Sequence, residues 1–238
     1  MAGHSAWKNI KHRKAAVDAQ RGRIWSKRSR AIIVAARHGG GDVKFNATLR
    51  LAVLDAKAAN MPRDTIEKAI KKGAGGLDGE RFEAVRYEGY GPSGVAVVVE
   101  ALTSNLNRTA PEIRTLFDKN GGKLGVPGSV AFSFSQKGVL LIAAESVRED
   151  RLMELALEAG AEDVGTMDEG FQVLTDPAHF GAVREAIDHA GIPVESAEIL
   201  FLPMSPVHID EQALANLEQL VEALEEHEDV QKVHTSVA

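Results

Sequence analysis

The hydrophobic positions in the first third of the chain recur at the three-to-four-residue spacing of amphipathic helices. This pattern predicts one helix over residues 22–38, a second over residues 45–60, and a third that begins at Pro62 and ends before Gly73. A run of three glycines at residues 39–41 ends the first helix, because glycine adopts the left-handed stop conformation without strain. Three helices this short need one another to bury their apolar stripes, so we expect a small bundle.

A glycine-rich linker at residues 73–79 separates these helices from segments with a different pattern. Short apolar runs rich in β-branched or aromatic residues follow, and they predict strands at residues 95–99 and 129–135. Between the two strands, Thr109 and Glu112 have the spacing of a capping box. We therefore expect a helix to begin at Thr109.

Residues 138–203 alternate predicted strands and helices in a regular order. The elements are a strand at 138–143, a helix capped by residues 146–149, a hairpin of strands at 163–167 and 171–175, a helix opened by Asp176 and Pro177, and a strand at 197–203. Their order is β-α-β-β-α-β, which is typical of ferredoxin-like folds.

The end of the chain has too few elements to fold alone. Residues 210–226 are predicted to form an acidic helix and residues 230–237 a strand, and these two cannot make a core. We therefore expect this tail to return and complete the sheet begun earlier. The predicted fold class is α+β, with a basic three-helix domain at residues 1–77, a discontinuous α+β domain at residues 80–135 plus 204–238, and a ferredoxin-like α+β domain inserted in it at residues 136–203.

Charge is distributed unevenly along the chain, although the formal net charge is only −6. Residues 1–77 contain 17 Lys and Arg and five acids, so their net charge is 17 − 5 = +12. Residues 78–238 contain 11 Lys and Arg and 29 acids, so theirs is 11 − 29 = −18. This asymmetry predicts a basic module that meets an anion and an acidic body that does not.

The first 38 residues combine ten Lys and Arg with one acid and hold both tryptophans of the protein. Dense positive charge beside planar rings suits a nucleic acid with exposed bases. The alternative is a solvated basic face with the tryptophans packed in the bundle; the single sign of the charge favours nucleic acid. Trp7 is the stacking candidate, and Trp25 is expected to pack in the bundle. The predicted nucleic-acid contacts are Trp7, Lys8, Lys11, His12, Arg13, Lys14, Arg21, Arg23, Lys27, Arg28, Arg30 and Arg37.

Motifs that carry catalytic chemistry are absent from the sequence. There is no cysteine, which excludes disulfides, thiolate catalysis and cysteine-based zinc sites. Residues 89–94 match G-x-G-x-x-G but precede a strand, so we interpret them as a turn. His227 stands among three glutamates and is expected to be a solvated helix end instead of a metal ligand. Arg108 is expected to lie in a turn and cap, with a phosphate contact as the alternative. We expect no enzyme activity, metal, cofactor or small-molecule substrate.

The sequence also bears on location. Its start is too charged for a secretory signal peptide. No apolar run approaches the roughly 20 residues that span a bilayer. We expect a cytoplasmic protein that does not bind membranes.

Several blocks of the sequence resemble the YebC/PmpR family of probable transcriptional regulatory proteins, whose mitochondrial relatives are translational activators of cytochrome c oxidase. The blocks are residues 1–5, Trp7, residues 9–16, Asp18, and residues 34–37, 39–42, 58–62, 69–73, 87–92, 107–109 and 128–132. The resemblance implies a helical amino-terminal domain and two α+β domains, the middle one closed by the carboxy-terminal tail. It also implies a cytoplasmic nucleic-acid-binding regulator without a cofactor.

Our leading hypothesis is a non-enzymatic regulator that binds DNA through the basic domain and influences transcription. No helix presents Asn, Gln and Arg in the manner of a recognition helix, so we expect weak sequence readout. The alternative is a translation factor whose same domain binds ribosomal RNA on the ribosome, because charge does not separate duplex DNA from structured RNA. A third hypothesis is a protein-interaction module whose acidic body binds a basic partner. The sequence leaves the oligomeric state open.

Overall fold

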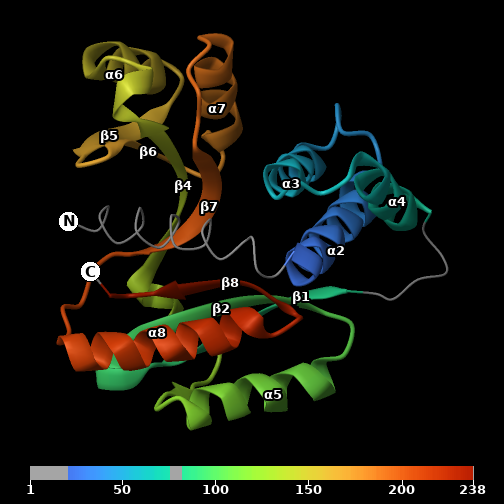
Figure 1. Cartoon of the computed structure of the whole chain (residues 1–238), viewed down its shortest axis with the longest axis vertical. Coiled ribbons are helices and arrows are strands. Elements are labelled where there is room, and N and C mark those ends of the chain that lie inside the picture. The colour runs from blue at the N-terminus through green and yellow to red at the C-terminus, as the bar shows by residue number, and fades with distance from the viewer. Residues whose placement is uncertain (1–20, 76–81, 238) are drawn as a thin grey trace. The chain divides into compact units, whose positions relative to one another are not determined.

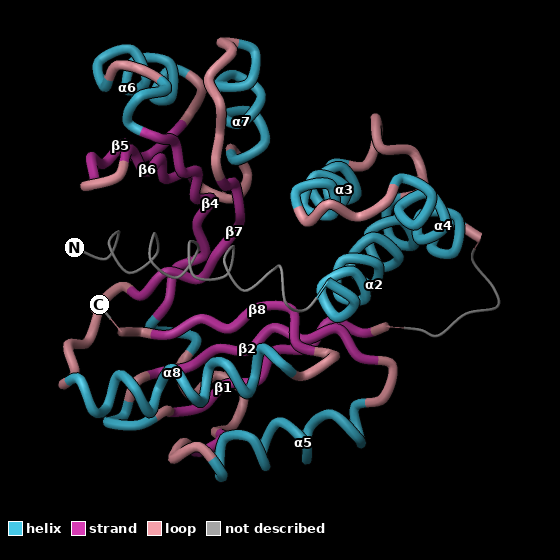
Figure 2. The backbone as a smooth tube through the Cα atoms, viewed as in Figure 1, coloured by secondary structure: helices cyan, strands magenta, loops and turns pink. Residues whose placement is uncertain are grey.

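The computed structural model of the chain describes residues 21–75 and 82–237 (Figures 1 and 2). These residues form three helices followed by two four-stranded sheets with helices, so the α+β fold class is confirmed. The described residues group into two compact units, with 21–75, 82–130 and 209–233 in one and 131–208 and 234–237 in the other. The three-domain boundaries proposed from the sequence stay a prediction.

The three amino-terminal helices form where the apolar spacing predicts them. They are α2 (Arg21–Gly39), α3 (Ala47–Ala58) and α4 (Arg63–Ala74). Ile32, Leu49 and Ile66 belong to the core that the helices share. Trp25 packs against this core, and its Nε1 donates a hydrogen bond to the carbonyl oxygen of Ala59 at 3.1 Å. The expected packing role of Trp25 is therefore confirmed.

Gly73 does not end the third helix, contrary to the prediction. It lies inside α4, is buried, and faces α2. A Cβ atom at this position would lie 2.5 Å from the carbonyl oxygen of Ile33 and 2.7 Å from the Cβ of Ala36. Glycine is therefore required here by the close approach of two helices, and the stop that the sequence suggested comes two residues later, at the Gly75 C-cap.

The first sheet has the strand order β3-β1-β2-β8, so the tail does complete it. Its elements are β1 (Glu83–Tyr90), the 3-10 turn η1 (Pro92–Gly94), β2 (Ala96–Thr103), α5 (Leu106–Lys119), β3 (Lys123–Leu124), α8 (Glu211–Glu226) and β8 (Val230–Thr235). A Cβ at Gly89 would meet Phe117 of α5, and one at Gly91 would meet Leu217 of α8. Because positions two apart share a face, both helices cover the same side of this sheet (Figure 1). Gly89 and Tyr90 are the last residues of β1, and residues 91–95 make the turn into β2, so the G-x-G-x-x-G match is part of a strand and a turn.

The prediction that a capping box at Thr109 begins a helix is wrong. Helix α5 begins three residues earlier, and Asn105 is its N-cap, with a side-chain oxygen that accepts from the backbone N–H of Arg108 at 3.1 Å. Asparagine is at least as good an N-cap residue as threonine, so the sequence contains two candidate N-caps four residues apart, Asn105 and Thr109. Thr109 is instead fully buried within the first turns of the helix, where its hydroxyl donates a hydrogen bond to Asp229.

The second sheet has the strand order β5-β6-β4-β7, and its chain order confirms the ferredoxin-like prediction. Its elements are β4 (Phe134–Ala143), η3 (Ala144–Ser146), α6 (Glu149–Glu158), β5 (Ala161–Met167), β6 (Gly170–Thr175), α7 (Phe180–His189) and β7 (Ser196–Pro203).

Two details of this second region differ from prediction. Of the expected strand at residues 129–135, only Phe134 and Ser135 are in a strand. The 3-10 turn η2 (Ala131–Ser133) precedes them, and β4 runs unbroken through Gly138. Phe132 consequently points to solvent instead of the sheet. The N-cap of α6 is Arg148, which makes no side-chain cap bond, so Ser146 does not cap that helix.

We expect Gly73→Ala to lower the free energy of unfolding by about 2 kcal/mol, because the added methyl group has no room beside the Ile33 carbonyl. Urea unfolding followed by circular dichroism measures this. Gly181 of α7 is the matched control: its Cβ position is open, so Gly181→Ala should stabilise by about 0.5 kcal/mol through helix propensity. A neutral Gly73→Ala would contradict the close contact.

Candidate nucleic-acid interface

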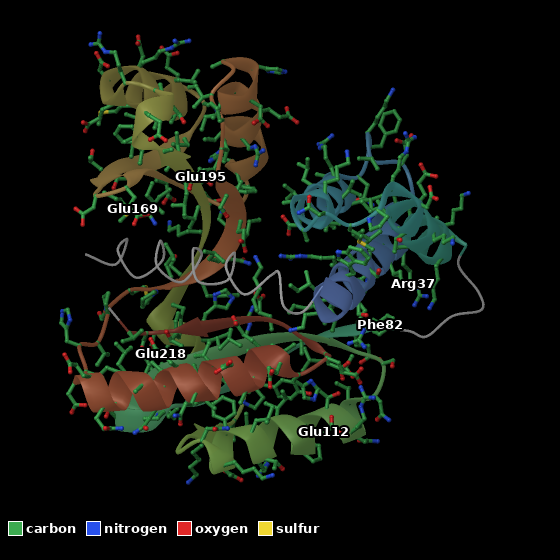
Figure 3. All side chains as sticks on the ribbon, viewed as in Figure 1. Arg37, Phe82, Glu112, Glu169, Glu195 and Glu218 are labelled. Atoms are coloured by element: carbon green, nitrogen blue, oxygen red, sulfur yellow. The ribbon has the colours of Figure 1, made fainter. Side chains whose placement is uncertain are left out.

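The predicted contact residues fall into three groups by what the structure describes. Trp7, Lys8, Lys11, His12, Arg13 and Lys14 lie outside the described residues. Arg21 and Arg23 belong to the first turn of α2, and only their backbone is described. The side chains of Lys27, Arg28, Arg30 and Arg37 are described; all four are on α2 and all are partly buried. Figure 3 labels Arg37 on the helical bundle and Phe82 just before β1.

Arg30 is held by acceptors of its own chain. Its side chain is 16% exposed, and its Nη1 donates to Asp229 Oδ1 at 2.6 Å and to the carbonyl oxygen of Glu228 at 2.5 Å. Its Nη2 lies 3.3 Å from a carboxylate oxygen of Glu228. The guanidinium carbon stands 5.4 Å from the ring centre of Phe82, in cation–π contact. Arg30 therefore joins α2 to the residues just before β8 and β1.

Two further predicted contacts also have partners inside the same unit. Lys27 Nζ donates to the carbonyl oxygen of Glu225, near the carboxy-terminal end of α8. Arg28 Nη1 lies 3.4 Å from Asp55 Oδ2 of α3. A phosphate that approached Lys27, Arg28 or Arg30 would have to compete with these partners. Their assignment as nucleic-acid contacts stays a prediction.

The carboxylate of Asp229 is the centre of this network, and its side chain is only 1% exposed. Its Oδ2 accepts from Arg108 Nη2 at 2.6 Å and from the Thr109 hydroxyl at 2.7 Å. The Thr109 oxygen lies 2.7 Å from that of Thr103. Either of these two hydroxyl groups can be the donor in this contact. Asp229 thus receives two guanidinium groups and a short chain of hydroxyls.

These neighbours decide the charge of Asp229. Burial alone would raise the pKa of this carboxyl group, because a buried carboxylate loses hydration. Hydrogen bonds from Thr109, Arg108 and Thr103, together with the positive charge of Arg30, outweigh burial and bring the pKa below its usual value. The same carboxylate raises the pKa of Arg108. The anion that Arg108 contacts in the structure is therefore internal, which disfavours the alternative of a phosphate at this loop.

The exposed positive charge of the bundle lies mostly on lysines that were not among the predicted contacts. Residues 21–75 contain 13 Lys and Arg and four acids, so their net charge is 13 − 4 = +9. Lys68, Lys71 and Lys72 are exposed on α4. Their i, i+3, i+4 spacing places them on one face of the helix. That spacing is visible in the sequence, but the prediction was based on the first 38 residues, where the positive charge is denser.

His227 is not the solvated helix end that the sequence suggested. Its side chain is 10% exposed, its Nε2 lies 3.0 Å from a carboxylate oxygen of Glu112, and its Nδ1 accepts from the backbone N–H of Asp229. Within residues 21–75 and 82–237, no group of three or more His, Cys, Asp and Glu side chains could hold a metal ion. In those same ranges, no helix is both long and apolar enough to cross a bilayer.

We expect Asp229→Asn to lower the free energy of unfolding by about 3 kcal/mol at pH 7, because the partly buried guanidinium group of Arg30 and the exposed one of Arg108 both lose their counter-charge. Urea unfolding measures this, and Glu67→Gln, which breaks only the exposed pair with Arg63, should change little.

The effect of this substitution should depend on pH. The pKa of Asp229 is lower in the folded chain than the unfolded value of about 3.9, so the carboxylate stabilises the fold above that pH. This contribution is lost as the pH falls through the folded pKa. The difference between wild type and Asp229→Asn should be constant from about pH 7 to 5 and shrink below about pH 4. An undiminished difference at about pH 3 would show that the carboxylate charge is not what stabilises the network.

Comparison with known proteins covers nearly the whole chain. Residues 5–76 match the model of the TACO1/YebC protein N-terminal domain, and residues 82–237 match that of the TACO1/YebC second and third domain. A probable transcriptional regulatory protein of Caldanaerobacter subterraneus subsp. tengcongensis is 48% identical over 238 residues, 100% of this chain and 98% of the relative. One from Rubrobacter xylanophilus is 51% identical over 237 residues, 99% of this chain and 95% of the relative.

A solved structure shows the same fold. The crystal structure of a conserved hypothetical protein, Aq1575, from Aquifex aeolicus matches with a TM-score of 0.85 and 48% sequence identity. The match covers 94% of this chain and 93% of that one. The blocks that suggested a family are therefore part of a full-length relationship, and the chain belongs to the TACO1/YebC family.

Proposed function

We propose that this chain is a non-enzymatic regulator that binds nucleic acid through its basic amino-terminal domain, most simply DNA in the control of transcription. The observation that carries the proposal is the net positive charge of the bundle, +9 over residues 21–75 (13 − 4). The relatives' names, probable transcriptional regulatory proteins, support the role in transcription.

The described side chains favour two different roles for the basic residues, one in binding phosphates and one in holding the fold together. Lys68, Lys71 and Lys72 are exposed on one face of α4, where phosphates can reach them from solvent. Lys27 and Arg30 are bonded to the region around Glu225 and Asp229, so they hold α2 in place. The basic residues at positions 8–14 add further charge to the proposed interface.

The rest of the chain helps to orient the ligand. Residues 78–238 have a net charge of 11 − 29 = −18 and repel a polyanion. A nucleic acid is therefore attracted to the amino-terminal domain and kept from the remainder. Because the exposed lysines suit phosphates and not base edges, binding should be only weakly sequence-specific.

The second candidate is an RNA-bound translation factor that uses the same domain on ribosomal RNA. The family model's description names TACO1 beside YebC, and the mitochondrial members that the sequence resembles are translational activators. Lysines on a helix face serve structured RNA as well as they serve duplex DNA. Sedimentation of the native protein with ribosomes from cell extract, abolished in the charge-reversal variants below, would favour this candidate over DNA.

We expect the triple variant Lys68→Glu, Lys71→Glu, Lys72→Glu to weaken binding to a duplex of about 20 base pairs, long enough to fill the face of one small domain. The slope of log K against log salt should become less steep by about 0.9 for each phosphate that the variant no longer neutralises. Fluorescence anisotropy over a salt series measures both quantities. Reversal of Lys11, Arg13 and Lys14 to Glu should act in the same direction.

The control for these reversals changes the net charge equally but elsewhere. Arg114, Arg148 and Arg151 are exposed and lie beyond the bundle, so their reversal to Glu should leave the salt slope unchanged. Equal weakening in the control and the α4 variant would show that only the total charge matters. Unchanged affinity in both amino-terminal variants would defeat the DNA and RNA proposals together.

A further inference from the structure

The connection between α2 and α3 presents an aromatic ring that has no part in the proposed lysine surface. This loop, residues 40–46, projects beyond the ends of the helices that it joins (Figure 1). The side chain of Phe45 in the loop is 89% exposed, the largest value among the exposed large hydrophobic side chains of the described residues. A phenylalanine in a small bundle ordinarily contributes to the core. Here the core of the bundle closes without it.

The exposure of this ring does not come from a loosely held loop. Asn46 is buried, and its Nδ2 donates to the carbonyl oxygens of Ala35 and Gly40, both at 2.8 Å. Its Oδ1 accepts from the N–H of Leu49 at 3.0 Å and caps α3. The backbone N–H groups of Phe45 and Asn46 donate to the carbonyl oxygen of Asp42 at 3.2 and 3.0 Å. The backbone that presents the ring is therefore fixed before any ligand arrives, so little ordering entropy is lost on binding.

Positive charge stands beside the ring. Lys44 precedes it and is exposed, and Arg50 of α3 donates from Nη1 to the carbonyl oxygen of Lys44 at 3.3 Å. A single exposed aromatic residue needs no explanation by itself. A ring on a rigid, projecting loop, next to two cations in a bundle of net charge +9 (13 − 4), has the parts that hold an unstacked base and its phosphates.

We propose that Phe45 is a stacking site for an unpaired base of single-stranded nucleic acid, with Lys44 and Arg50 on the flanking phosphates. This inference rests on the proposed function and names the form of nucleic acid that the domain prefers. A base within a duplex keeps both faces covered by its neighbours and cannot use the ring. The loop therefore selects single strands, or unpaired bases in a folded RNA, over continuous duplex.

An anionic lipid surface is the competing occupant, since an aromatic ring beside lysine also suits a membrane interface. One phenylalanine is a weak anchor there, because even a myristoyl chain, with far more apolar surface, gives only marginal membrane binding. A base, in contrast, needs only one ring face to stack on. The observations therefore favour the nucleic-acid base.

The test is the affinity of the full-length protein for an oligothymidylate of about 12 nucleotides, within the site size of a small single-strand binding domain, and for a duplex of equal length. Phe45→Ala should weaken single-strand binding about tenfold and leave duplex binding unchanged, since base–aromatic stacking typically accounts for this much or more. Phe45→Trp should keep the affinity, and the oligonucleotide should quench its fluorescence more than that of the wild type, which contains Trp7 and Trp25. Phe132, which is 70% exposed in the other compact unit, is the matched control. Phe132→Ala should not weaken binding, and Phe132→Trp should add no quenching beyond that of the wild type.

The outcomes separate this inference from the function on which it rests. If reversal of Lys68, Lys71 and Lys72 weakens single-strand binding but Phe45→Ala does not, the stacking site is overturned and nucleic-acid binding stands. If neither variant weakens binding and reversal of Lys11, Arg13 and Lys14 also leaves it unchanged, the proposed function itself fails. Quenching of Phe45→Trp by phosphatidylserine vesicles without quenching by the oligonucleotide would also overturn the stacking site. Circular dichroism confirms that each variant is folded.

Discussion

A carboxylate buried away from water is stable only with positively charged or hydrogen-bonding partners, and the partners of Asp229 come from separate segments of the chain. Its partners are Arg30 from the amino-terminal bundle and Arg108 and Thr109 from the start of α5. The buried charge therefore fixes three separate segments relative to one another within one compact unit. Each partner loses freedom to serve another anion, because its departure would leave the carboxylate buried without compensation.

This constraint sorts the basic residues by role. Positive charge on α2 looks like a surface for nucleic acid when the sequence is taken alone, yet Lys27, Arg28 and Arg30 all have acceptors within the chain. The exposed lysines of α4 have a different environment, with solvent around them and an apolar face behind them. The attraction of the domain for a polyanion depends on its net charge. Ion pairs between the bundle and acidic residues elsewhere in the chain reduce the positive charge near those pairs. Its contacts depend on the cations that remain accessible.

Local pattern was enough to predict most elements of the fold and failed where a distant contact decided the outcome. The helical and strand periodicities give the two sheets, the ferredoxin-like order and the return of the tail. Gly73 obeys the rule for a helix stop but is required by the close approach of α2, and Thr109 obeys the rule for a cap but bonds to Asp229. The partner of Arg30 is 199 residues away, so no spacing in the sequence could reveal it. The exposure of the α4 lysines and of the Phe45 ring depends on how the helices pack. The sequence alone therefore does not predict it.

The separation of Arg30 and Asp229 along the chain also implies that their ion pair depends on other contacts. Bringing together residues 199 positions apart costs about 5 kcal/mol of chain entropy, more than one ion pair supplies. Other contacts therefore have to position Asp229. The N–H of Leu102 donates to the Asp229 carbonyl oxygen at 2.8 Å, at the point where β8 joins β2, and this pairing brings the carboxylate to Arg108 and Thr109. Once the sheet is complete, docking of Arg30 closes only the short connection through Phe82. The ion pair between the amino-terminal helices and the residues before the last strand is thus supported by the pairing of β8 with β2.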